Sequence, residues 1–199
     1  MVRLEFLLEE LSMESFLKGF LPKILPDGYV YNQNYFLHPH QGKSDLLKSI
    51  PNKIKIDYGE TTAFIILHDQ DSNNCIDLKN KIKTICQTNC KNGNHYLIRI
   101  VCKELESWYL GDLDAIEKAF PKFKAAKYKN KSKFRNPDLM NAADEISKLL
   151  PEFQKNKGAR LMSQYIGSQE SNKSNSFNQF ISGLQRIVQS NRAKCTMAV

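Results

Sequence analysis

The stretch Phe64-Ile65-Ile66-Leu67-His68-Asp69-Gln70-Asp71 decides the fold class, because a strongly apolar run ends abruptly in two aspartates. A short, continuous apolar run is typical of a buried strand in a parallel sheet. In open α/β sheets, binding sites lie at the carboxyl ends of the strands. We therefore expect Asp69 and Asp71 to stand at the edge of the sheet that carries the functional site, where the alternation of side chains places both on the same side.

Strand-like and helix-like patterns alternate around this run. We expect strands over 2–9, 29–37, 61–68 and 96–102, and helices over 13–25, 44–50 (stopped by Pro51), 77–88 and 105–120. This order predicts an α/β fold with a mainly parallel four-stranded sheet flanked by helices. Helical patterns over 138–150, 155–165 and 177–188, with an exposed Ser/Asn-rich loop over 168–176, predict a C-terminal helical extension. The expected organisation is an α/β domain over 1–120, a basic segment and helical extension packed on it over 121–190, and a disordered tail over 191–199.

The composition favours a polyanionic partner. The 199 residues carry a net charge of +8 and a pI near 9.2, and a basic surface attracts nucleic acid, although a modest lysine excess also suits an ordinary solvated surface. No apolar run approaches the ~20 residues of a membrane span, and Glu5 interrupts the region where a signal peptide would be apolar. Five scattered cysteines fit a reducing compartment. We therefore expect a cytoplasmic protein that does not act at a membrane.

Acidic residues follow three of the expected strands. Because the carboxyl ends of parallel strands meet at one edge, we expect a single carboxylate cluster that binds Mg²⁺ or Mn²⁺. Its expected members are Glu9, Asp69, Asp71, Glu104 and Glu106, with Glu14 one turn into the first helix as a contact for a second ion. Glu9 is expected to be a ligand or a general acid/base. Asp-x-Asp before a helix is also a common N-cap pattern, so the pair alone leaves a capping role open.

Cations suited to phosphate lie in three places. Lys43, in Gln41-Gly42-Lys43-Ser44 at a helix start, is expected to contact the scissile phosphate or to be a solvated lysine in a turn. Segment 122–135 mixes cations with Phe and Tyr residues that could stack on bases, and its alternatives are a mobile basic loop or a docking arm. The expected nucleic-acid contacts are Lys124, Lys127, Lys129, Lys131, Lys133 and Arg135, joined by Lys155 and Arg160 of the following helix.

Glu9 after the first strand and Asp69-x-Asp71 after the third resemble the Toprim domain of type IA and II topoisomerases, bacterial primases and nucleases of the OLD (overcoming lysogenization defect) group. The resemblance implies a Toprim-like fold over residues 1–120, a divalent metal held by the Asp-x-Asp pair, and a Glu in acid/base chemistry. Glu14 matches the extra acid in the first helix of OLD-like nucleases. Glu10 stands where Toprim domains usually have glycine.

Longer motifs resemble the family named domain of unknown function 4276. They are LEELSME (8–14), HQGKSDL (40–46), DQDSNNC (69–75), KELESWYLGD (103–112) and FQKNKGAR (153–160). This kinship implies an AAA or ABC-type ATPase partner in a bacterial anti-phage system. The expected function is a divalent-metal-dependent nuclease that hydrolyses DNA or RNA, tRNA included, as the effector of such a system. The alternative is a catalytically inactive Toprim-fold module that binds the ATPase or nucleic acid, and a homo-oligomer is compatible with either.

Overall fold

A four-stranded, all-parallel sheet forms the centre of the protein. The computed structural model describes residues 1–91, 94–167 and 171–196, with side chains described up to residue 189. The strands are β1 (Arg3–Leu8), β2 (Tyr35–Pro39), β3 (Thr62–Asp69) and β4 (His95–Val101), in the order β2-β1-β3-β4. Their register ends with Leu8 beside Pro39 and Asp69 beside Val101. The predicted parallel α/β fold is therefore confirmed.

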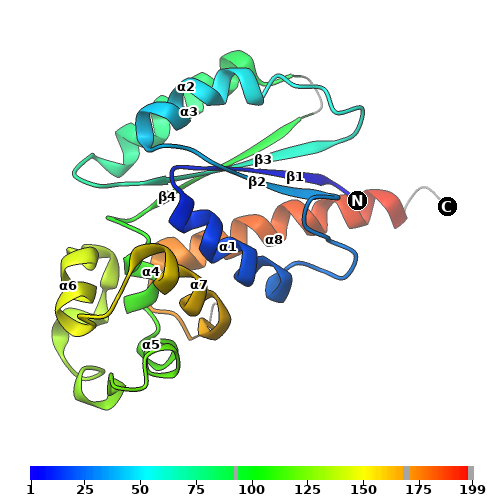
Figure 1. Ribbon diagram of the computed structural model, residues 1–199. Helices are drawn as coiled ribbons and strands as arrows, with labels where there is room; N and C mark the ends of the chain where they lie inside the picture. Colours follow the sequence, from blue (N-terminus) through cyan, green and yellow to red (C-terminus); the bar gives the residue numbers. More distant parts are fainter. Residues whose placement is uncertain (92–93, 168–170, 197–199) are drawn as a thin grey trace.

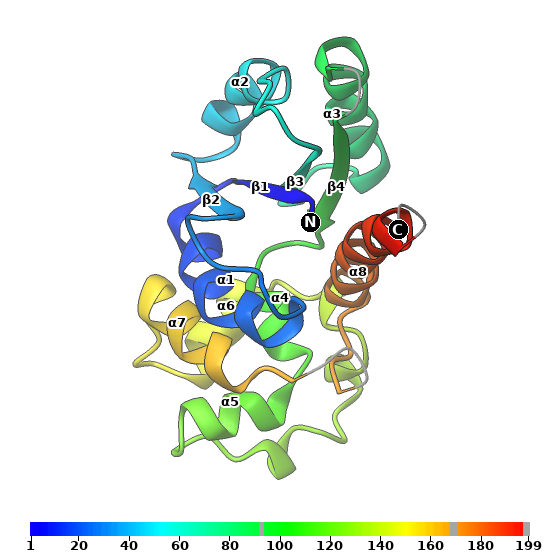
Figure 2. The same cartoon turned by 90° about the vertical axis from the view of Figure 1, so that its right-hand side faces the viewer.

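Helices cover both faces of this sheet (Figure 1). Helices α2 (Lys43–Lys53) and α3 (Cys75–Asn89) lie on one face, and α1 (Leu11–Ile24) and α8 (Asn175–Thr196) lie on the other, as Figure 2 also shows. Beyond the carboxyl ends of the strands lie α4 (Glu106–Leu110), α5 (Leu113–Ala119), α6 (Ala142–Leu149) and α7 (Lys155–Tyr165). Three short 3-10 helices, η1 (Ala125–Lys127), η2 (Ser132–Arg135) and η3 (Pro137–Leu139), join α5 to α6.

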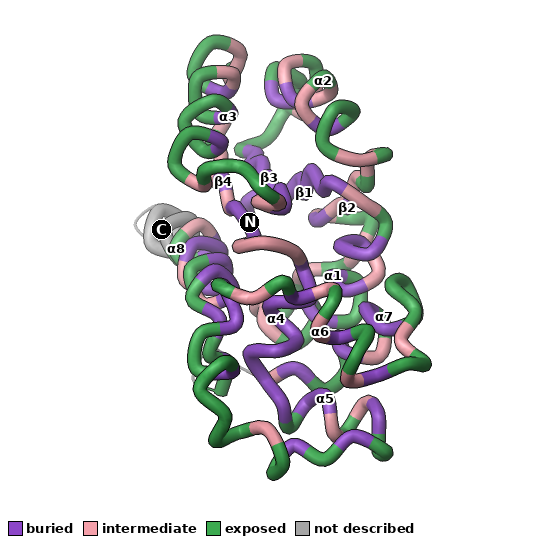
Figure 3. Tube along the Cα trace, turned by 90° about the vertical axis from the view of Figure 1, so that its left-hand side faces the viewer, coloured by how far each residue is buried: buried purple, intermediate pink, exposed green. Residues whose placement is uncertain are grey.

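Alternation along the buried strands sends side chains into two hydrophobic clusters. In β3, Ile65 and Leu67 join the larger cluster with α1, α4 and α7, whereas Phe64 and Ile66 join the smaller one under α2 and α3. The buried backbone of the sheet and of α4 is visible in Figure 3. The larger cluster is continuous across the two expected parts of the chain, because Trp108 stacks on Phe180 of α8 at 5.2 Å between ring centroids. The C-terminal helices thus complete the larger hydrophobic cluster, which packs against one face of the sheet.

Three expected elements have different bounds. The strand expected over 29–37 forms only from Tyr35, because Asn32 takes a left-handed φ of 61° in the turn before it. Helix α2 continues through Pro51, and Ile54 N still donates to Ile50 O at 3.0 Å. The helix expected over 105–120 divides into α4 and α5, because Asp112 caps α5 by accepting a hydrogen bond from Ala115 N.

The loop expected to be exposed over 168–176 is buried in part. Residues 168–170 lie outside the described part of the chain, whereas Asn172, Ser174 and Ser176 are buried. Ser174 Oγ donates to Asp138 Oδ1 at 2.6 Å, and Trp108 Nε1 donates to Ser176 Oγ at 3.0 Å. These hydrogen bonds therefore hold the loop against Asp138 and Trp108, since a buried polar group needs a partner.

The last residues belong in part to a helix. Helix α8 runs to Thr196 and so includes residues 191–196 of the expected tail, while residues 197–199 lie outside the described chain. Among the described helices, none has both the length and the apolar character required to cross a lipid bilayer.

Candidate metal centre

The candidate site lies where the order of the strands reverses. The chain passes from β1 to β2 on one side and then returns to place β3 on the other side of β1. The carboxyl ends of β1 and β3 therefore flank the topological switch point, where open α/β sheets bind ligands. Glu9 directly follows β1, Asp69 ends β3, and Asp69 N donates to Glu9 Oε2 at 2.9 Å. Glu9 and Asp69, 60 residues apart in sequence, therefore lie together at this edge of the sheet.

His68 holds Glu9 in place. His68 is 1% exposed, and its Nδ1 lies 2.8 Å from Glu9 Oε2. Burial opposes charge on both side chains, but their mutual hydrogen bond and attraction prevail and raise the pKa of His68 while lowering the pKa of Glu9. Sequence reasoning found no role for the histidines. The available signal was a histidine next to Asp69 inside an otherwise apolar strand, where a buried polar side chain needs a partner.

Asp69 and Glu106 are buried, and each has a carboxylate oxygen without a hydrogen-bond partner among the described residues. They are 5% and 3% exposed, and within the described chain Asp69 Oδ1 and Glu106 Oε2 have no hydrogen-bond partner. Burial, and then repulsion from Glu9 and Glu10, raises the pKa of Asp69 well above its usual value. Burial likewise raises the pKa of Glu106, which Lys155 partly offsets. Burial and mutual repulsion thus disfavour the charged forms of Asp69 and Glu106.

Tyr109 borders the same carboxyls. Its hydroxyl is fully buried and also lacks a partner among the described residues. Burial, followed by the charges of Glu106 and Asp69, raises the pKa of Tyr109 well above its usual value, so the phenol is neutral. A neutral hydroxyl can donate one hydrogen bond into the cluster.

Lys155 and Glu10 close one side of the cluster. Lys155 Nζ, at the start of α7, lies 2.7 Å from Glu10 Oε1 and 2.7 Å from Oε2. Glu10 also accepts from Ser12 Oγ at 2.5 Å. Burial would lower the pKa of Lys155, but the hydrogen bond to Glu10 and the charges of Glu106 and Asp69 raise it. The charge of Glu10 is therefore neutralised by Lys155.

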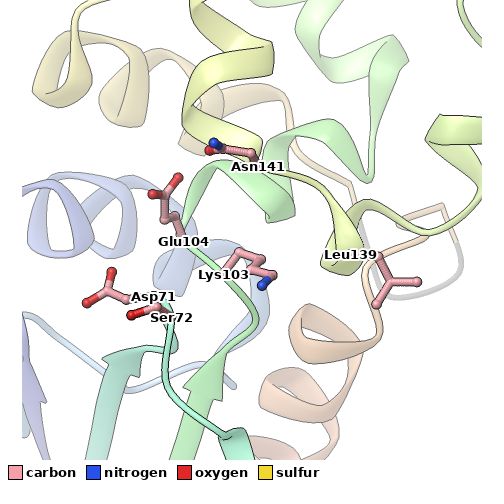
Figure 4. A pocket seen from close by; sticks show the side chains of 6 residues that line it. All are labelled: Asp71, Ser72, Lys103, Glu104, Leu139 and Asn141. Atoms are coloured by element: carbon pink, nitrogen blue, oxygen red, sulfur yellow. The ribbon is translucent and has the colours of Figure 1, made fainter.

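Asp71 and Glu104 lie beside an open pocket of about 540 Å³ (Figure 4). Asp71 takes a left-handed φ of 51°, which ends the strand alternation expected to place it beside Asp69, and its Oδ2 lies 3.4 Å from Lys43 Nζ. Glu104 accepts from Ala143 N at 2.9 Å and so ties the start of α6 to the pocket. The charge of Lys43 also contributes to the lowered pKa of Glu9, after the larger effects of His68 and Asp69, so the lysine lies near both acids.

Two expected site residues have other surroundings. Glu14 is buried on α1 and is bonded to Lys18 at 2.8 Å, one turn further along the helix. Arg160 is exposed, and its position five residues after Lys155 places it about 140° further around α7. Lys155 therefore reaches the acids, whereas Arg160 faces elsewhere.

The residues fit a divalent cation, judged by their unsatisfied oxygens. No group of three His, Cys, Asp or Glu side chains within the described chain is already gathered tightly enough to hold an ion. However, Asp69 Oδ1 and Glu106 Oε2 are buried acceptors without donors among the described residues, which is costly unless each oxygen meets a cation or carries a proton. Carboxylate oxygens are the ligands that Mg²⁺ and Mn²⁺ prefer. Asp69 and Glu106 are therefore the side chains with oxygens that suit an ion.

The basic segment is anchored to its neighbours. Ion pairs join Lys124 to Glu117 at 3.4 Å, Lys129 to Asp114 at 2.7 Å and Lys133 to Glu145 at 2.5 Å. Lys127, Lys131 and Arg135 are exposed, and the Lys131 ammonium lies 4.6 Å from the Tyr128 ring centroid. The segment therefore offers an ordered, positively charged surface.

The expected base-stacking role of its aromatic residues is wrong for Phe123 and Phe134. Both are buried in the larger cluster, and Phe123 stacks on Tyr128 with ring centroids 5.1 Å apart. Their burial fastens the segment to the core and leaves phosphate contacts by the cations as the interaction that this surface can make.

Comparisons with known proteins identify one relationship. No curated protein and no solved structure matched the chain. The match to a family model covers residues 8–185, from the last residue of β1 through α7 and the first half of α8. The chain therefore belongs to the family described as domain of unknown function DUF4276.

Proposed function

We propose that the protein is a divalent-metal-dependent nuclease of Toprim type, related to the OLD nucleases. The observation that carries this proposal is the pair of buried, unpartnered carboxylate oxygens on Asp69 and Glu106 at the switch point of the sheet. Such an arrangement destabilises the metal-free fold, and active sites are where proteins keep destabilising charge. Lys43 and Lys155 beside the cluster provide the positive charge that a phosphodiester substrate requires.

In this proposal each side chain has a distinct task. Mg²⁺ or Mn²⁺, when bound, neutralises charge on the scissile phosphate and acts as a Lewis acid. Asp69 and Glu106 hold the ion. Glu9, oriented by His68 and by Asp69 N, would accept the proton of the attacking water, whose oxygen bonds to phosphorus. The P–O bond to the leaving oxygen then breaks, and that oxygen takes up a proton from solvent. Lys43 binds a non-bridging phosphate oxygen, and Asp71 and Glu104 line the side of the site that is open to solvent.

The partners follow from the charge of the surface and from the family. The exposed cations of segment 122–135 would bind the phosphates of DNA or RNA, tRNA included. An AAA or ABC-type ATPase would control cleavage in a cytoplasmic anti-phage system, because an unrestrained nuclease would damage the cell that makes it.

The second candidate is a catalytically inactive module that binds the ATPase or nucleic acid. The absence of a preformed three-ligand group in the described chain and the Lys155–Glu10 pair favour it. The Mn²⁺ dependence of the thermal midpoint separates the two. The nuclease proposal expects Mn²⁺ to raise the Tm of the wild type and to leave Asp69→Asn unchanged, whereas an inactive module shows no shift in either protein.

A cleavage assay tests the activity itself. Plasmid, single-stranded DNA and tRNA are incubated with pure full-length protein and Mn²⁺, with and without the ATPase of the same system. Cleavage by the wild type that disappears in Glu9→Gln and Asp69→Asn supports the proposal. The matched control is Asp27→Asn, which changes an exposed acid in the turn after α1. Equal cleavage by all four proteins, or none on any substrate, contradicts it.

A further inference from the structure

Two thiols lie side by side behind the candidate site. Cys102 directly follows β4, and Cys75 is the first residue of α3. Their side chains are within hydrogen-bonding reach of each other. Both are partly exposed free thiols, and both line a cavity of about 150 Å³, which has room for a small oxidant because one water molecule occupies about 30 Å³ of liquid.

The thiols join the same two segments that build the pocket. Segment 70–74 leads from β3 to Cys75, and Cys102 leads to Lys103 and Glu104. Asp71 N donates to Lys103 O at 2.9 Å, and Lys103 N donates to Gln70 Oε1 at 3.1 Å. Hydrogen bonds already align the segments, so an added covalent link needs little rearrangement of the backbone.

The backbone at this junction is held in an unfavourable conformation. Asp71 and Lys103 both have left-handed φ values, 51° and 59°, which side chains other than glycine seldom adopt. Such conformations persist only where the surrounding contacts hold them. A bond that fixes the two segments would therefore decide how firmly the pocket side chains Asp71 and Glu104 keep their positions.

We propose that Cys75 and Cys102 are a reversible oxidation site, whose disulfide locks segment 70–75 against segment 102–104 at the rim of the candidate metal centre. This inference does not depend on nuclease activity. In a reducing cytosol, such bonds are transient and serve to sense oxidants.

The oxidant is a peroxide. The Cys75 thiolate attacks a peroxide oxygen, because burial raises the pKa of the Cys102 thiol to about 11; the O–O bond breaks, and the products are a sulfenic acid and hydroxide. The hydroxide takes the proton of the second thiol and becomes water. The second thiolate then attacks the sulfenic sulfur, the S–S bond forms, and the S–O bond breaks to release a second hydroxide that is protonated to water. Two thiols and one hydrogen peroxide thus give one disulfide and two waters, and a dithiol reductant reverses the result.

Peptide mapping tests the proposal directly. Full-length protein is treated with hydrogen peroxide, its remaining thiols are blocked, and it is digested without reduction and analysed by mass spectrometry. We expect a peptide pair linked through Cys75 and Cys102 in the wild type and in Cys90→Ser, and none in Cys75→Ser or Cys102→Ser. Cys90 is the matched control, because it lies at the other end of α3, about 22 Å from Cys75 for a helix of 15 residues.

The oxidised protein should also behave differently in solution. The bond closes a loop of roughly 27 residues, so the Tm should rise by about 5–10 °C and return after reduction. Amide exchange in residues 70–75 and 102–104 should slow by about tenfold. Links between other cysteines while Cys75 and Cys102 stay reduced, oxidation of either thiol only to sulfinic acid, or unchanged exchange in the linked form would overturn the proposal.

Discussion

Replacing Asp69 with asparagine should stabilise the metal-free protein while removing its response to metal. The side chain is 5% exposed, and its Oδ1 has no partner within the described chain. Repulsion from Glu9, Glu10 and Glu106 adds to the cost of burial. Asparagine keeps the size of the side chain, removes its charge, and supplies an N–H₂ group that can donate to a neighbouring carboxylate.

The size of the effect follows from the cost of an unsatisfied buried acceptor. That cost is about 1–3 kcal/mol, and more for a charged group. For a chain of this length, each kcal/mol corresponds to about 2–4 °C in Tm, so Asp69→Asn should melt about 3–9 °C above the wild type at neutral pH.

The dependence on pH has a definite sign. Because burial raises the pKa of native Asp69 above the value near 4 of the unfolded chain, the native carboxyl keeps its proton to a higher pH. The native state therefore binds more protons than the unfolded state above about pH 4, and the free energy of unfolding falls as the pH rises toward the native pKa. Asp69→Asn should flatten this fall, and Mn²⁺ should oppose it in the wild type.

Chemical denaturation with chelator present, repeated between pH 4 and pH 8, measures both effects. Asp27→Asn is the control, since its carboxyl is exposed. A variant that is less stable than the wild type at pH 7.5, or that keeps the same slope against pH, would refute the argument, because Asp69 would then be compensated in the native state.

Three further predictions concern neighbouring groups. Tyr109→Phe removes a buried hydroxyl without a described partner, so the free energy of unfolding should rise by about 1 kcal/mol in denaturant titrations, and a loss of stability would show that the hydroxyl is bonded. Lys155→Met should lower the free energy of unfolding by less than about 1 kcal/mol, because the ion pair with Glu10 is half exposed. The same change should enlarge the Mn²⁺-dependent rise in Tm. Lys157→Met is the control, and equal Mn²⁺ responses of the two variants would exclude Lys155 from the cluster. Lys127→Glu combined with Arg135→Glu should weaken binding to DNA or tRNA at least about tenfold, measured by fluorescence anisotropy. The slope of log K against log salt concentration should become shallower by roughly 2. Unchanged affinity would show that segment 122–135 is not part of the nucleic-acid interface.

The strand at residues 64–69 illustrates what local pattern can predict. Its apolar run and the acids that follow it predicted a buried parallel strand and placed Asp69 at the mouth of the sheet. Glu9 could be paired with Asp69 for the same reason, since parallel strands end at one edge. The bounds of β2 and of α4 could not be predicted as well, because they depend on Asn32 in a turn and on Asp112 as a cap.

The sequence could predict which acids belong to the candidate site, but it could not predict how their side chains are arranged. Periodicity suggested that Asp69 and Asp71 share a side, but the left-handed backbone of Asp71 turns it toward Lys43. Glu14 is one turn from the strand end in sequence, yet Lys18 on the same helix engages it. His68 and Tyr109 enter the site through burial and through partners distant in sequence, for which a single chain carries only a weak local signal.

The sequence by itself determined the parallel α/β fold, the positive charge and the supply of carboxylates at the strand ends, because these properties depend on hydrophobic periodicity and composition. Only the tertiary structure decided which carboxyls are buried without a partner, that Lys155 neutralises Glu10, and that Cys75 meets Cys102. The physical reason is that charge compensation and thiol contact depend on distances and solvent exclusion between segments far apart in the chain, which no local pattern encodes.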